Sequence, residues 1–318
     1  MTEPSSTWLR VPPPDQMGRP GRLFVHFAAR LRASASQAGR PIATDDAYLD
    51  WEASSAGTAW DYYQRFLPPE GRLCILDVGA GPSGRTAHYA GRRNALFICL
   101  DLDAELQRVA SRNLTDELRE RVVPVVGEAG CLPFPDGSLD VCLCENALEH
   151  FTASDSAIRD MARVLRPGGL LLVLLPPWRG PFAGHLSRLT WLPWIHLLPP
   201  WVFLRLLCAL QPGPNAVERA RQGHVMATYL ATHLNGWPLK RLLQGFEASR
   251  NLALVDAYVL GEGRMGRVLR FVPWLGEFFT GAIYLVFRRL ETERSMRLTF
   301  SRLLWTTLRG RSLRRLED

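Results

Sequence analysis

The chain contains few cysteines, and they form no recognisable pattern. Its six cysteines include no C-x-x-C pair and no Cys/His cluster at zinc spacing, which argues against a structural zinc module. The sequence also lacks an internal repeat and an apolar h-region near residue 1. We therefore expect a cytoplasmic protein that binds no metal and keeps its cysteines reduced and buried.

Acidic residues are scarce in two segments. Residues 178–210 contain three arginines and no acid, and residues 288–318 contain nine arginines against four acids, within a net charge of +7. Basic segments beside apolar ones indicate an anionic partner, either a membrane or a nucleic acid. A nucleic acid is not expected, because the tail contains no recognition motif and no clear stacking platform.

Short apolar runs alternate with helical patterns from residue 72 onward. The runs cover 73–79, 95–103, 122–129, 139–146 and 170–176, and two further runs follow at 252–260 and 281–289. Apolar strands of this length, separated by helices, predict β-α-β units and a parallel sheet buried on both faces. Ligands of such sheets bind beyond the carboxyl ends of the strands.

The first run ends in "LDVGAGPSG", with glycines at 79, 81 and 84. This spacing is shared by nicotinamide and flavin sites, by methyl-donor sites and by plain tight turns. Gly79 and Gly81 permit close backbone approach to a ligand, and Gly84 permits tight packing of the following helix. Asp101 ends the second run about twenty residues further on, where a carboxylate accepts hydrogen bonds from ribose hydroxyls.

Asp77 separates the alternative cofactors. It stands two residues before the first glycine, where a carboxylate repels a pyrophosphate and attracts the amino group of an amino acid. That placement favours S-adenosylmethionine over a dinucleotide. An Asp that only bonds to nearby turn backbone is compatible with the same position.

Four stretches resemble one family. They are "LDVGAGPSG", "CLDLDAELQRVA", "VVGEAGCLPFPDGSLDVCLCENALEHF" and "MARVLRPGGLLLV", which together span roughly residues 70–176. The chain resembles class I S-adenosylmethionine-dependent methyltransferases of the group that includes ubiquinone and menaquinone biosynthetic enzymes. The resemblance implies an α/β, Rossmann-like fold: a mostly parallel seven-stranded sheet with helices on both faces, a helical insertion and helical termini.

The resemblance also implies roles for individual residues. Backbone at Gly79, Ala80 and Gly81 is expected to line the methionine part of the donor, with Asp77 near its amino group and Gly84 in the same loop.

Further residues are implied at the ends of the next three strands. Asp101 is expected to bind the ribose hydroxyls, and Leu102 to pack on the adenine ring. Glu128 replaces the Asp that the family commonly places near the adenine amino group, and Ala129 follows with a backbone amide. Glu145 is expected near the sulfonium and the acceptor.

His150 is the leading candidate for a catalytic base, because it follows the fourth strand on the expected site side. A base is needed only when the acceptor must lose a proton. A histidine that caps or packs is the competing interpretation. His185, His224 and His233 are weaker candidates.

The expected organisation has five parts. An N-terminal helical extension (1–70) precedes the donor-binding core (71–176), a hydrophobic helical cap (177–237), the end of the sheet domain (238–290) and a basic amphipathic tail (291–318). Prolines at 193, 199 and 200 interrupt the apolar part of the cap, so it is not expected to span a membrane. A lid packed on its own domain is the alternative to an acceptor or membrane site.

The tail places five apolar residues on one helical face: Met296, Phe300, Leu303, Leu304 and Leu308. This pattern is typical of a helix that lies in a membrane interface, and equally of one docked on the cap or on a partner subunit. Segments 178–210 and 288–318 are the candidate membrane contacts.

The sequence thus predicts a methyltransferase that acts on a hydrophobic or lipid-linked small molecule, with oxygen preferred over carbon or nitrogen by family habit. Two alternatives remain open at this point. A non-catalytic S-adenosylmethionine-binding interaction protein would keep the same fold. A nucleotide-linked oxidoreductase would share the glycine spacing, although Asp77 argues against it.

Overall fold

The computed structural model describes residues 56–181, 192–210, 215–217, 219–220, 235–261, 272 and 276–309. The chain divides into two compact units. One comprises Met1–Ile42 with Trp178–Gly236, and the other comprises Ala43–Pro177 with Trp237–Asp318. The second unit, here called the sheet unit, contains every strand of the described sheet. The five-part division expected from the sequence stays a prediction.

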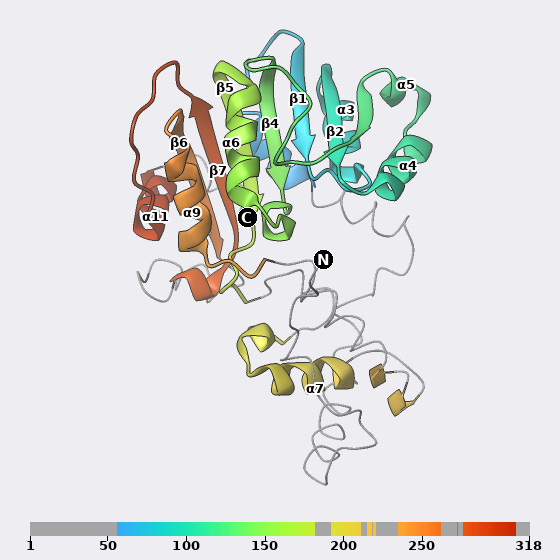
Figure 1. Ribbon diagram of the computed structural model, residues 1–318, viewed down its shortest axis with the longest axis vertical. Helices are drawn as coiled ribbons and strands as arrows, with labels where there is room; N and C mark the ends of the chain where they lie inside the picture. Colours follow the sequence, from blue (N-terminus) through green and yellow to red (C-terminus); the bar gives the residue numbers. More distant parts are fainter. Residues whose placement is uncertain are drawn as a thin grey trace. The chain divides into compact units, whose positions relative to one another are not determined.

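A seven-stranded sheet forms the centre of the sheet unit (Figure 1). Its strands follow the order β3-β2-β1-β4-β5-β7-β6, and only β7 runs antiparallel to its neighbours. The strands are β1 (Leu73–Val78), β2 (Ala95–Asp101), β3 (Val122–Val126), β4 (Leu139–Glu145), β5 (Leu165–Leu175), β6 (Leu252–Gly261) and β7 (Thr280–Arg289). The expected mostly parallel, Rossmann-like fold is confirmed. Its strand order reverses direction between β1 and β4, and such a switch point is where ligands bind.

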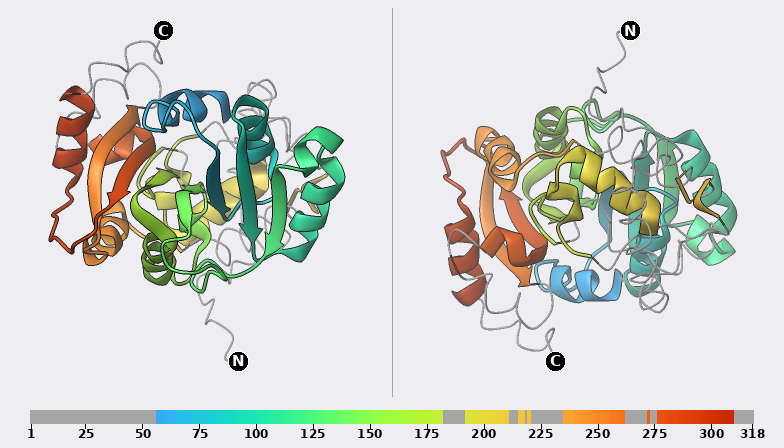
Figure 2. Two further views of the ribbon diagram at one scale, coloured as in Figure 1. Left: turned by 90° about the horizontal axis from the view of Figure 1, so that it is seen from above. Right: turned by 90° about the horizontal axis from the view of Figure 1, so that it is seen from below.

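Helices cover both faces of this sheet. They include α3 (Gly84–Arg92), α4 (Ala104–Asn113), α5 (Asp116–Arg119), α6 (Ser154–Val164), α9 (Leu239–Ala248), and two short 3-10 helices, η3 (Leu148–His150) and η6 (Gly276–Phe279). A further helix is described over 56–63. Figure 2 shows the 56–63 helix on one side of the sheet, with α6 and α9 on the other.

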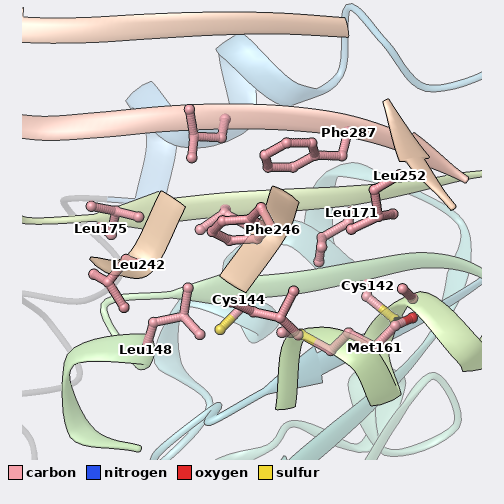
Figure 3. Close-up of a cluster of buried hydrophobic side chains, with 14 of the residues drawn as sticks. Cys142, Cys144, Leu148, Met161, Leu171, Leu175, Leu242, Phe246, Leu252 and Phe287 are labelled. Carbon is pink, nitrogen blue, oxygen red and sulfur yellow. Dashed lines mark hydrogen bonds between the residues drawn. The ribbon is translucent and has the colours of Figure 1, made fainter. Parts of the chain in front are cut away.

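The strands are apolar because they are buried from two sides. Residues 169–175 of β5 are all buried. One core cluster packs the sheet against α6 and α9, where the rings of Phe246 and Phe287 stack 4.7 Å apart (Figure 3). A second cluster packs the opposite face against α3 and the 56–63 helix. This two-sided burial explains the near-continuous apolar runs in the sequence.

The six cysteines are free thiols. Four are buried and Cys74 is half-buried, but Cys131 is exposed. The expectation of buried cysteines was therefore wrong for Cys131, which follows the turn after β3 and not a strand.

The tail helix α11 (Phe300–Arg309) packs on the edge strand β6. Leu303 and Leu304 are buried there. The Thr307 hydroxyl donates to the Ala257 carbonyl at 3.0 Å and accepts from the Val259 amide at 3.1 Å. The predicted amphipathic helix is present, and the described side chains of its apolar face pack on the core of the sheet unit.

The described part of the other unit contains η5 (Ile195–Leu197) and α7 (Pro200–Leu210). Leu197, Leu198 and Trp201 are exposed, and the Arg205 guanidinium lies 5.4 Å from the centre of the Trp201 ring. None of the helices in the described ranges is long and apolar enough to cross a membrane.

Candidate functional site

The glycine turn after β1 adopts a left-handed backbone that other residues rarely take. Gly79 has a φ of 77° and Gly81 a φ of 54°. The amides of Gly79 and Ala80 donate to the Leu100 carbonyl at 2.8 and 3.1 Å, which ties the turn to the end of β2. A Cβ added at Gly79 would lie 2.5 Å from the Cβ of Ala147, in the turn after β4. Only glycine therefore fits between the ends of β1 and β4.

Asp101 closes the turn from the side of β2. Its Oδ2 accepts from the Gly81 amide at 2.9 Å, and its Oδ1 accepts from the Asp103 amide at 2.9 Å. A carboxylate has about four acceptor positions, so lone pairs remain for further donors. The next side chain, Leu102, is 73% exposed. The end of β2 thus presents a carboxylate with free acceptor positions beside an exposed apolar side chain.

The turn after β3 lies against this corner. The Gly127 amide donates to the Asp101 carbonyl at 3.0 Å, which brings Glu128 and Ala129 to the edge that holds the glycine turn. Glu128 is exposed and Ala129 is half-buried. The structure thus brings the predicted residues of β1, β2 and β3 to one edge of the sheet.

Asp77 lies inside the fold behind the glycine turn. It is only 4% exposed, and the Thr86 hydroxyl of α3 donates to its Oδ2. Burial raises the pKa of the neighbouring Cys99 thiol to about 12, and the Asp77 charge adds to that increase. The hydrogen bond from Thr86 to Asp77 thus links the end of β1 to α3, the helix that follows it.

Glu145, the last residue of β4, forms a buried ion pair with Arg85 of α3. The Arg85 Nε lies 2.9 Å from one carboxylate oxygen, and its Nη2 lies 3.3 Å from the other. The Tyr89 hydroxyl donates to the first oxygen at 2.7 Å. Burial alone would lower the pKa of Arg85, but Glu145 and Tyr89 outweigh it and the pKa is raised. The Glu145 carboxylate, which was expected near the sulfonium, is thus hydrogen-bonded to Arg85 and Tyr89 of α3.

The turn after β4 contains two further titratable residues. Asn146 has a φ of 51°, and its amide donates to the Leu174 carbonyl at 2.8 Å. In η3, burial raises the pKa of the Glu149 carboxyl to about 8. His150 follows and is partly exposed. His185, His224 and His233 lie outside the described residues.

Sequence reasoning overlooked the polar face of α3. Arg85, Thr86 and Tyr89 are all buried, although the first two are polar. The signal was available, because residues at i, i+1 and i+4 share a helix face, and here that face carries an arginine directly after the glycine turn. Glu149 was also overlooked beside His150. Gly84, the first residue of α3, stays a predicted packing position.

Comparisons with known proteins agree with this geometry over part of the chain. Residues 76–173 match the family model described as a methyltransferase domain. An uncharacterized methyltransferase of Mycobacterium sp. (strain JLS) is 38% identical over 144 residues, which cover 45% of this chain and 54% of that protein. One of Mycobacterium leprae (strain TN) is 36% identical over 123 residues, which cover 39% and 44%. The chain spans about half the length of the curated relatives it matches.

A solved S-adenosylmethionine-dependent methyltransferase from Mesorhizobium loti is also similar, with a TM-score of 0.49 and 19% identity over 74% of this chain and 99% of that one.

The mostly parallel sheet, with the glycine turn at its switch point and the Asp101 carboxylate at the end of β2, has the Rossmann-like fold that class I methyltransferases share. The match to a methyltransferase domain covers residues 76–173, from the end of β1 into β5.

Proposed function

We propose that the protein transfers the methyl group of S-adenosylmethionine to an oxygen atom of a hydrophobic or lipid-linked small molecule. The observation that carries the proposal is the corner formed by Gly79, Gly81 and Asp101, with Leu102 exposed beside it. The corner fits the donor, because Asp101 retains acceptor positions and Leu102 offers an apolar surface to a base. The residues that would hold the donor are Asp77, Gly79, Ala80, Gly81, Asp101, Leu102, Glu128 and Ala129.

When bound, the donor supplies an electrophilic methyl group on a positively charged sulfur. The main task of the protein is to align an acceptor with that methyl group and to exclude water. An acceptor hydroxyl that took this methyl group would have to lose its proton, so a base beside the acceptor would be needed. We assign that proton to His150, which follows β4 beside the turn that contacts Gly79.

Substitution of His150 by Ala tests the assignment. We expect methyl transfer to fall by about a hundredfold or more, the ordinary contribution of a general base, while donor binding stays unchanged. The measurement is single-turnover transfer beside calorimetric donor binding. Unchanged transfer would remove His150 from the mechanism.

A hydrophobic acceptor is supported by the unit that contains residues 178–236. Its described part exposes Leu197, Leu198 and Trp201. The same stretch contains arginines and no acid between 178 and 210. Apolar and aromatic side chains beside arginine are suited to a hydrophobic molecule with a polar or anionic end.

These residues also support a location in the cytoplasm at the inner face of a membrane. Tryptophan and arginine are the side chains that favour a bilayer interface. Co-sedimentation with liposomes that contain anionic lipid tests this, and Trp201→Ala is expected to reduce binding. Val123→Ala is the control, because Val123 of β3 is 42% exposed and lies outside both candidate membrane segments. Equal binding of all three proteins would contradict the membrane contact.

A transfer screen tests the proposed activity. The protein is incubated with methyl-labelled S-adenosylmethionine and a cell extract that is then separated into lipid and aqueous fractions. At a donor concentration below saturation, we expect label in the lipid fraction with wild-type protein and with Asp116→Asn, whose side chain is 99% exposed on α5, and clearly less label with Asp101→Asn. Label confined to the aqueous fraction would refute the acceptor class.

A further inference from the structure

A buried cluster of polar side chains joins α3 to the end of β4. Glu145 accepts three hydrogen bonds, two from Arg85 and one from Tyr89. The side chains of Arg85 and Glu145 are only 9% and 2% exposed. Arg85 Nη2 also lies 3.3 Å from the Tyr89 hydroxyl oxygen. The Glu145 charge is therefore balanced by Arg85, and donors from one helix occupy three of the about four acceptor positions of the carboxylate.

A buried ion pair such as Arg85–Glu145 is uncommon in a protein core. Removal of two charges from water costs free energy that their attraction only partly returns, and apolar residues of similar volume often serve stability as well or better. Buried ion pairs are therefore better explained where they fix a particular geometry. Here the geometry concerns two chain segments that both leave the candidate donor site.

Each member of the pair is attached to one wall of that site. Arg85 is the second residue of α3, which begins directly after the glycine turn. Glu145 precedes Asn146, whose backbone is left-handed, and Ala147, whose Cβ lies where a side chain on Gly79 would have to be. The ion pair thus connects the helix on one side of the glycine turn with the turn that presses on its other side.

A third element borders the cluster. Tyr63, from the 56–63 helix, is fully buried, and its hydroxyl has no hydrogen-bond partner among the described residues. Burial, followed by the nearby Glu145 charge, raises the pKa of Tyr63 well above its ordinary value, so the hydroxyl stays neutral. The end of β4 is therefore enclosed by α3 and by the helix that precedes the sheet.

We propose that Arg85 and Tyr89 are positioning residues of the donor site, which hold Glu145 as a neutralised anchor and thereby fix the turn after β4 against Gly79. In this arrangement the Glu145 carboxylate does not contact the sulfonium of the donor. The proposal rests on the proposed function, and it replaces the direct role that the sequence suggested for Glu145.

S-adenosylmethionine and S-adenosylhomocysteine distinguish the two roles of Glu145. The two molecules share the adenosine and the amino acid, but only the first carries a positive charge on sulfur. A positioning role predicts that loss of the anchor weakens both ligands by the same factor. A direct contact between Glu145 and the sulfonium predicts that Glu145→Gln weakens the first and spares the second.

The experiment measures the Kd of both ligands by calorimetry for wild type, Glu145→Gln and Tyr89→Phe. Tyr89→Phe keeps the ring and leaves the ion pair in place, so it protects the test against a variant that fails to fold. Arg108→Met is the matched control, because Arg108 pairs with Glu105 at 2.7 Å on α4 with both side chains about 60% exposed. Thermal unfolding of each variant monitors the fold.

We expect Tyr89→Phe and Glu145→Gln to weaken both ligands equally, by roughly tenfold, the lower end of what a hydrogen bond to a charged group contributes. Arg108→Met is expected to bind both as wild type does. Selective loss of S-adenosylmethionine binding in Glu145→Gln, or unchanged binding in Tyr89→Phe, would overturn the proposal. Wild-type protein that binds neither ligand would instead overturn the proposed function.

Discussion

Replacement of Gly79 by alanine perturbs the glycine turn most directly. Two costs are expected. The φ of 77° places alanine in the left-handed region, which costs an L residue about 1–2 kcal/mol. The new methyl group would lie 2.5 Å from the Cβ of Ala147 and 3.3 Å from the ring of Phe151, and overpacking of this kind costs about 1–3 kcal/mol. Together they predict a loss of about 2–5 kcal/mol in the free energy of unfolding.

Two other glycines separate these costs. Gly81 has a φ of 54°, but nothing lies within 4 Å of an added Cβ, so Gly81→Ala carries only the backbone cost of about 1–2 kcal/mol. Gly91 lies inside α3 with open space around it, and Gly91→Ala is expected to stabilise the protein by about 0.5–1 kcal/mol.

The assay is urea unfolding of the three variants beside wild type, with calorimetric titration of S-adenosylmethionine on each. The predicted order of stability is Gly91→Ala, wild type, Gly81→Ala and Gly79→Ala, and donor binding is expected to be lost in Gly79→Ala while Gly91→Ala retains it. If Gly79→Ala is no less stable than Gly81→Ala, the turn after β4 does not press on Gly79 and the reasoning is refuted.

Three further predictions concern charged side chains of the site. Arg85→Met leaves the buried Glu145 carboxylate without its partner, so it should lower the free energy of unfolding by about 3–5 kcal/mol. Arg108→Met removes an exposed ion pair and should change that free energy by less than about 1 kcal/mol. Equal values for the two variants in urea unfolding would contradict the burial of the Arg85–Glu145 pair. The pKa of Glu149 is raised to about 8, so the folded protein keeps a proton that the unfolded chain releases above its ordinary pKa of 4.5. Stability should therefore fall as pH rises from about 4.5 to about 8, by a few kcal/mol, and unfolding curves of Glu149→Gln that keep this slope would exclude Glu149 as its source. Asp101→Asn loses the charge that favours ribose hydroxyls and should weaken donor binding by about tenfold or more, and unchanged affinity would remove Asp101 from the site.

The order of strands and helices was predictable because a parallel sheet buried on both faces leaves a strong record in sequence. β1, β2, β4 and β5 are nearly continuous apolar runs, and each ends near a glycine, an acid or a proline. The glycine turn and Asp101 were predictable for a related reason, since a fixed spacing along the chain brings them to neighbouring strand ends.

The ion pair was not predictable in the same way. Arg85 and Glu145 are separated by 60 residues, and their contact depends on how β4 lies beside β1 in the sheet. Sequence reasoning overlooked Arg85, and a helical pattern alone does not show which charged residue its side chain meets. The contacts of the tail helix were likewise not predictable. Its apolar face was evident from the spacing of its residues, but its contact with Ala257 and Val259 depends on β6 being the edge strand.

The corner formed by Gly79, Gly81 and Asp101 is proposed to bind a methyl donor and not a dinucleotide. Calorimetric titration of the protein with S-adenosylmethionine and, separately, with NAD tests this most directly. We expect saturable one-to-one binding of S-adenosylmethionine and no detectable heat from NAD. Tight binding of NAD without binding of S-adenosylmethionine would contradict it.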